Sequence, residues 1–262
     1  MFSTTVVVVT VLAAWFGPAR ADSSATNPGF HWKGKVPAGQ QVEIRGINGS
    51  IHAEPALGND VEVVAHKTGQ PYDDVAAIEV QVVEHDGGVT FCAVYPSLNG
   101  RQPACLPGAG SPLNSAGNDV NIDFLVRLPK GVRFVGRTVN GQVEAKSLQA
   151  DTEAHTVNGN VRLSTAGAAV GETVNGSIIA SVGKINSDSK FSTVNGGITV
   201  EMPQTAAAEV HAGTRNGHIH TDFPLSMHDE FASRRADGII GHGGPDLTIV
   251  TVNGTINLRR RF

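Results

Sequence analysis

Apolar and polar residues alternate along much of the chain, and the alternation recurs around the dipeptide Asn-Gly. In one copy Val139, Val143 and Ala145 are apolar, whereas Glu144 between them is charged. A period of two residues is typical of a β-strand with one buried and one solvated face. We therefore expect strands in which the valine before each Asn-Gly points inward, for example Val194 in a later copy.

The Asn-Gly motif occurs seven times, most often as Thr-Val-Asn-Gly. The copies are Asn48-Gly49, Asn140-Gly141, Asn158-Gly159, Asn175-Gly176, Asn195-Gly196, Asn216-Gly217 and Asn253-Gly254. From Asn140 onward the spacings are 18, 17, 20 and 21 residues, and then 37, about twice the unit. A unit of 17–21 residues suits one coil of a β-solenoid, in which asparagines of successive coils stack and pair through their amides.

An antiparallel β-meander is the alternative architecture. Asn-Gly favours two-residue hairpin turns, because both residues tolerate positive φ. In such a meander, every second turn would be an Asn-Gly turn. The repeat length favours the all-β, solenoid-like stack over the meander.

The repeats define one large domain. We expect a single β-repeat domain over residues 36–262, preceded by a flexible segment at 22–35. Clusters of Pro, Gly and Asn predict a loop near 96–118, and a second loop is expected near 222–245.

The N-terminus indicates export. An apolar stretch over residues 6–16 is followed by Ala19-Arg20-Ala21, so residues 1–21 are predicted to be a signal peptide. The stretch is shorter than the roughly 20 residues that span a bilayer, and we expect no transmembrane segment in the mature chain. A periplasmic or extracellular location would favour a disulfide between Cys92 and Cys105.

The composition argues against several functions. A net charge of -4, without a run of basic residues, speaks against a nucleic-acid partner. Glycosidase-like chemistry would need paired carboxylates on adjacent coils. The acidic residues of the repeats instead fall in different columns of the alignment: Glu144, Glu153, Glu172, Asp188 and Glu201. We therefore predict no catalytic residues and no enzyme activity.

Histidines are the other candidate chemistry. His218 and His220 would share one face of a strand, but a metal site needs three or four placed ligands. We expect a solvated face there, with no metal and no cofactor.

The last strand ends in Arg259-Arg260-Arg261. Clustered charge at an exposed strand edge discourages edge-to-edge pairing. The arginines are predicted either to protect the open end of the stack or to form a solvated tail.

Three features together resemble the bacterial putative-adhesin family, domain of unknown function 4097. They are the Thr-Val-Asn-Gly copies, the segment Gly39–Ala53 and the ending Arg234–Ile256, and the resemblance covers Val36–Arg260. Arg215 departs from the pattern, which has Val there. The resemblance implies a solenoid-like envelope or secreted protein with no catalytic residues to carry over. We expect a non-enzymatic scaffold, adhesive or binding an envelope or surface partner; the alternative is a carbohydrate-active enzyme on a β-solenoid.

Overall fold

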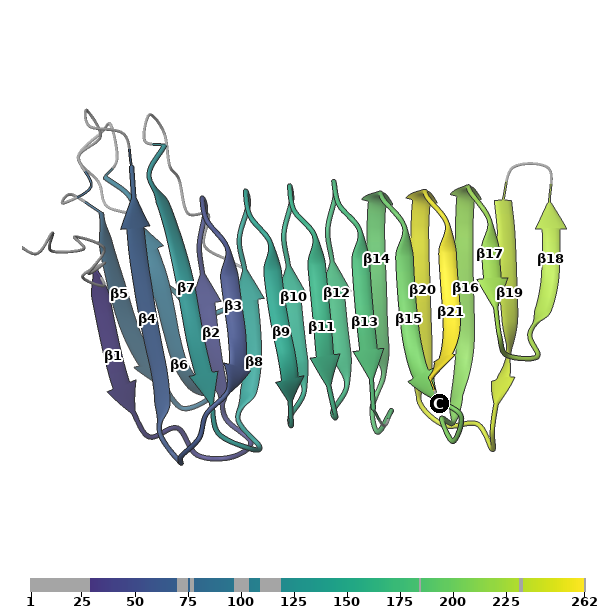
Figure 1. The fold of residues 1–262 in the computed structure, drawn as a ribbon, viewed down its shortest axis with the longest axis horizontal. Helices are drawn as coiled ribbons and strands as arrows, with labels where there is room; N and C mark the ends of the chain where they lie inside the picture. The colour runs from purple at the N-terminus through teal and green to yellow at the C-terminus, as the bar shows by residue number, and fades with distance from the viewer. Residues whose placement is uncertain are drawn as a thin grey trace, which may run out of the picture.

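Two elongated β-sheets stack face to face (Figure 1). The computed structural model describes residues 29–69, 75, 78–96, 104–108, 119–183, 185–230 and 233–261. The predicted signal peptide and most of the predicted loop at 96–118 lie outside the described residues. Within those described ranges, no helix is long and apolar enough to cross a membrane.

The order of the strands across each sheet differs from their order in the chain. Sheet A has 10 strands, which are in spatial order β1 (Phe30–Gly34), β4 (Val61–Thr68), β7 (Asn121–Leu128), β3 (Ile51–Pro55), β9 (Val143–Leu148), β11 (Val161–Thr165), β13 (Ile178–Val182), β15 (Ile198–Pro203), β21 (Ile256–Arg261) and β17 (Ile219–Thr221). Sheet B has 11 strands, which are in spatial order β18 (Ser226–Glu230), β19 (Ser233–Ile240), β16 (Ala208–Asn216), β20 (Asp246–Asn253), β14 (Ser189–Asn195), β12 (Ala169–Glu172), β10 (Thr152–His155), β8 (Arg133–Arg137), β2 (Gln41–Arg45), β6 (Gly88–Val94) and β5 (Glu79–His85).

The central strands pair in parallel. Successive strands such as β8, β9, β10 and β11 alternate between the sheets, and each pairs with the equivalent strand of the next coil. Parallel pairing between equivalent positions is the arrangement of a β-solenoid-like stack and excludes the antiparallel meander for these strands. Antiparallel strands occur at the ends, where β1 pairs with β4, β5 with β6, and β18 with β19.

Two coils are displaced from their sequence positions in the stack. The coil β6–β7 lies outside β2–β3, although it follows β2–β3 in the chain. At the other end the last coil, β20–β21, lies between β14–β15 and β16–β17, where its yellow strands interrupt the green ones in Figure 1. The coil at each end of the repeat sequence therefore has a neighbour on both sides.

Two expectations about irregular segments were wrong. The expected loop at 222–245 contains β18 and β19, an antiparallel hairpin that extends sheet B beyond β16. The expected flexible segment at 22–35 contains β1, whose alternating burial lets Phe30 and Trp32 pack against Phe91. Both segments lack the Asn-Gly motif, so the search for repeats could not detect their strands.

The asparagines form a continuous ladder along one edge of the stack. Each side-chain amide donates to the side-chain oxygen of the next asparagine, with Nδ2 to Oδ1 distances of 2.7–2.9 Å. The spatial order is Asn48, Asn140, Asn158, Asn175, Asn195, Asn253 and Asn216. Because the last copy is inserted, Asn253 stands between Asn195 and Asn216.

The glycine of each motif is required by a close backbone approach. A Cβ on Gly159 would lie 1.9 Å from the carbonyl oxygen of Gly141, and a Cβ on Gly176 would lie 1.9 Å from that of Gly159. Among these glycines only Gly49 has a positive φ, of 116°. Asn-Gly is therefore needed here because only glycine lets successive coils stack closely at the corner between the sheets. In a hairpin turn, the same dipeptide would be needed for its positive φ angles.

The inward parity was wrong for the valine before the asparagine in three central copies, whereas Val139 is partly buried against the core. Val157, Val174 and Val194 are 38–40% exposed, while the threonine before each of them is buried. Thr156 Oγ1 donates to the carbonyl of Gly141 at 2.9 Å, and the other threonines repeat this bond. The chain bends at Asn-Gly, so the alternation in one strand does not continue into the next; beyond the bend, Val143 and Ala145 are buried as expected.

The arginines at the end of the chain do not protect an open edge. β21 pairs with β15 over its full length, up to Arg261, and with β17 over Ile256–Leu258. The Arg260 amide donates to Asp222 Oδ2 at 2.9 Å, and its guanidinium lies over the Phe223 ring. The edge strand of sheet A at this end is β17, which has 3 residues and therefore offers little backbone for pairing.

Substituting Gly159 with Ala should destabilise the fold by about 3 kcal/mol, at the upper end of overpacking, because the new methyl group meets backbone that cannot rotate away. Urea unfolding followed by circular dichroism would measure the change. Gly58→Ala is the control, because a Cβ on Gly58 has nothing within 4 Å. Equal unfolding midpoints for the two variants would contradict the stacking requirement.

Candidate functional site

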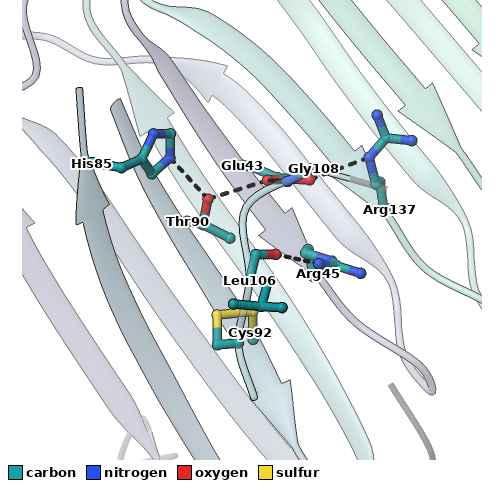
Figure 2. The surroundings of a disulfide bond; sticks show 9 residues. Glu43, Arg45, His85, Thr90, Cys92, Leu106, Gly108 and Arg137 are labelled. Carbon is teal, nitrogen blue, oxygen red and sulfur yellow. Dashed lines mark hydrogen bonds and ion pairs between the residues drawn. A yellow bond between two sulfur atoms is a disulfide. The ribbon is translucent and has the colours of Figure 1, made fainter. Parts of the chain in front are cut away.

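A short segment covers the outer face of sheet B near its N-terminal end (Figure 2). Residues 104–108, called the cover segment, are tied to β6 by a disulfide between Cys92 and Cys105, with a Cα–Cα distance of 5.7 Å. The Arg45 guanidinium donates to the Leu106 carbonyl, and the Gly108 amide donates to Glu43 Oε2 at 2.9 Å. Glu43 and Arg45 are consequently 1% and 5% exposed, although their outward positions would be solvated on a bare sheet.

Glu43 is the most enclosed charge of this surface. Thr90 Oγ1 donates to its Oε2 at 3.1 Å, and Arg137 Nε donates to its Oε1 at 3.2 Å. His85 Nε2 lies 3.2 Å from Thr90 Oγ1 and extends the network toward β5. A buried carboxylate with a guanidinium and two further donors is compensated for its loss of hydration.

The ion pairs continue from Arg137 across the next coils. Arg137 Nη2 lies 3.6 Å from Glu153 Oε2, and His155 Nε2 lies 3.5 Å from the same oxygen. His155 Nδ1 lies 3.1 Å from Glu172 Oε2, and Lys190 Nζ lies 2.8 Å from Glu172 Oε1. Six side chains from five adjacent strands thus form the charged row: Glu43, Arg137, Glu153, His155, Glu172 and Lys190.

The neighbours fix the protonation of the two central carboxylates. The close approach of the His155 ring lowers the pKa of Glu153, and the nearby Arg137 and Arg133 add to this effect. Burial raises the pKa of Glu172, but Lys190 and His155 outweigh burial and lower it overall. Both carboxylates are therefore ionised at neutral pH and unsuited to donate a proton.

Burial also lowers the pKa of the Arg45 guanidinium, although the negative charge of Glu43 raises it.

The other acidic candidates are scattered, as their columns indicated. Glu144 lies on sheet A, where its Oε2 is 2.9 Å from His52 Nδ1. Asp188 Oδ1 accepts the Asp246 amide at 3.0 Å. Only Glu153 and Glu172 come together, with His155 between them.

The two candidate metal ligands lie side by side near the end of sheet A. The rings of His218 and His220 are stacked with centroids 6.2 Å apart. In the part of the chain that the structure describes, no group of three or more His, Cys, Asp or Glu side chains converges on one point.

The charged row escaped sequence reasoning. Its members occupy the first or the third position before the buried threonine, or before Gly46 in the first copy, so they fall in two columns of the repeat alignment. Long side chains reach diagonally between neighbouring strands, which joins the two columns into one row. A comparison of charges across both outward columns would have revealed it.

Comparison with known proteins gives one family and several solved structures. The family model described as Toastrack DUF4097 matches residues 137–259. A putative cell adhesion protein from Clostridium sporogenes ATCC 15579 is 11% identical, with a TM-score of 0.36 over 88% of this chain and 99% of that chain. A putative adhesin from Bacteroides fragilis NCTC 9343 is 12% identical, with a TM-score of 0.30 over 88% of this chain and 96% of that chain. No curated protein matches the chain.

Replacing Arg137 with Met should destabilise the fold by about 2 to 3 kcal/mol. This is less than the full effect of isolating a buried charge, because Thr90 and Gly108 still donate to Glu43. Thermal and urea unfolding would measure the change. Lys33→Met, which removes an exposed pair with Asp60 at 3.5 Å, is the matched control and should change stability by less than about 1 kcal/mol. Similar losses in both variants would contradict the enclosed pairing of Glu43.

Acid should weaken the charged row. Glu153 has a lowered pKa in the fold, so its stabilisation is present above the unfolded value of 4.5 and is lost as the pH falls through the folded pKa. Glu153→Gln should therefore be less stable than the wild type at pH 7, by on the order of 1 kcal/mol, and the difference should shrink below pH 4.5. Unfolding midpoints between pH 7 and pH 3 would show this, with Glu79→Gln on the edge strand β5 as the control. A difference that does not depend on pH would contradict the ion pairing.

Proposed function

We propose that this chain, whose residues 137–259 match the Toastrack DUF4097 family model, is an exported, non-enzymatic scaffold that binds a partner of the cell envelope or surface. The observation that carries the proposal is the disulfide-tied cover segment over Glu43 and Arg45. A disulfide that encloses charged side chains persists in an oxidising compartment, whereas cytosolic reductants keep thiols free. The predicted signal peptide supports the same location.

The electrostatics favour binding over catalysis. A glycosidase acid needs a carboxyl group with a raised pKa, but the pKa values of Glu153 and Glu172 are lowered. Every carboxylate of the charged row is paired with a cation. Such fixed, alternating charges can orient a partner and select it by complementarity.

The repeats also give a regular surface along the asparagine edge. Val157, Val174 and Val194 form an exposed apolar column beside the asparagine ladder, with one step per coil of about 4.8 Å. Solenoid stacks commonly bind through such extended surfaces, and an exposed apolar stripe on a soluble protein indicates contact with another molecule. In each Thr-Val-Asn-Gly unit, Thr and Gly would thus stabilise the stack, and Val would contact the partner.

Two measurements test the proposal with the full chain. Thiol labelling of unreduced, denatured protein from whole cells that make the full chain should find no free thiol. The purified protein on beads should retain an envelope preparation, and the triple variant Val157→Ser, Val174→Ser, Val194→Ser should retain several-fold less. Leu57→Ser, at a fully exposed residue away from this edge, is the control. Two free thiols would contradict export, and equal retention by the wild type and the triple variant would contradict binding through the valine column.

A further inference from the structure

A basic depression lies on the outer face of sheet B, far from the cover segment. It has a volume of about 290 Å³ and lies over β16, β19 and β20. Its lining includes Gly213 and Val250 together with the arginines Arg215, Arg234 and Arg235, and no acidic side chain. The volume is at the lower end of the range for small-molecule sites, about 300–1,000 Å³, so it suits one compact group.

Gly213 creates the depression. In the register of the sheet it stands between Val250 on β20 and Arg235 on β19. The equivalent outward position carries Arg45, Arg137, His155 and Glu172 in other coils. A Cβ on Gly213 would meet only the Arg234 carbonyl oxygen, at 3.9 Å, so the sheet itself does not require glycine here. The missing side chain leaves the space between the arginines open.

The two exposed arginines of the depression have unused donors. Arg215 and Arg235 make no hydrogen bond or ion pair with any described side chain. Arg234 differs, because its guanidinium donates to the Gly217 carbonyl. Among the described side chains, the acidic neighbour on the same face of β19 is Asp237, and its Oδ1 is engaged by His211 Nδ1 at 2.9 Å. Two guanidiniums therefore flank a gap with little local compensation of their charge.

We propose that this depression binds an oxyanion, the carboxylate, sulfate or phosphate group of an acidic ligand. A guanidinium presents a planar fork of donors that matches two oxygens of such a group. Arg215 stands where the repeat otherwise has Val, which places the second cation beside Arg235. Val250, 43% exposed, offers an apolar wall for the body of the ligand. Arg215 occupies the position of the exposed valines two coils beyond Val194, but the proposal does not rest on the proposed function.

The test titrates the folded full chain with sodium sulfate, sodium phosphate or sodium glucuronate at constant ionic strength, with chloride as the balancing anion. The Nε–Hε signals of the arginines are followed by NMR. We expect saturable shifts of the Arg215 and Arg235 signals with at least one anion, and the tightest of the three identifies the acid group. Arg215→Gln and Arg235→Gln should each weaken binding at least tenfold, and Gly213→Leu should abolish it by filling the gap.

Arg162→Gln is the matched control, because Arg162 is an exposed arginine on the outer face of sheet A. It should leave the affinity unchanged. Shifts that stay linear for all three anions, or that saturate equally in the wild type and both arginine variants, would overturn the proposal. If Gly213→Leu lowers the unfolding midpoint, the arginine variants still decide the question, because they remove donors and leave the backbone unchanged.

Discussion

The stack depends on one close approach, in which the carbonyl oxygen of a motif glycine meets the glycine of the next coil. The distance leaves no space for a side chain, and the same carbonyl accepts the hydroxyl of the buried threonine, as Gly141 does from Thr156. The asparagine beside it bonds to the asparagine of the next coil. Three residues of each copy therefore act at one corner and fix the register of both sheets. The charged row and the basic depression both follow from that register, since it decides which outward side chains become neighbours.

The N-terminal part of the stack shows how an outward surface can be converted into an interior. Glu43 and Arg45 occupy positions that are partly solvated in later coils, for example Glu153 and His155. The cover segment removes them from water, and Thr90, Gly108 and Arg137 replace the lost hydration of Glu43. One crosslink to β6 holds this arrangement, so the outer face of sheet B has an enclosed end and an open end. The basic depression lies toward the open end, where Gly213 leaves space.

The sequence could predict the parts of the fold that repeat. The all-β class, the coil length and the stacked asparagines follow from the spacing of Asn-Gly, because equivalent residues of a solenoid must align. The inward position of Val194 was wrong, since the bend at Asn-Gly reverses which residues of the strand face inward. The coil order could not be deduced, because the copy at Asn253 carries the same Thr-Val-Asn-Gly as the copy at Asn195 and fits any neighbour. The candidate site was missed for a different reason: most of its ion pairs join residues of two different columns, and a column alignment separates them.

The inserted last coil has a consequence for synthesis. A chain that emerges from the ribosome N-terminus first completes β16–β17 before β20–β21 exists, and the edge of β14–β15 is then open to it. The corner residues of β16–β17 are compatible with that edge, so two mutually exclusive neighbours compete for one surface during translation. The native arrangement is reached only when β20–β21 has been made and has entered between β14–β15 and β16–β17, so this insertion is a late step of folding. Loss of the last coil would therefore remove a segment from within the stack, and β16–β17 with its hairpin would have to join a different neighbour.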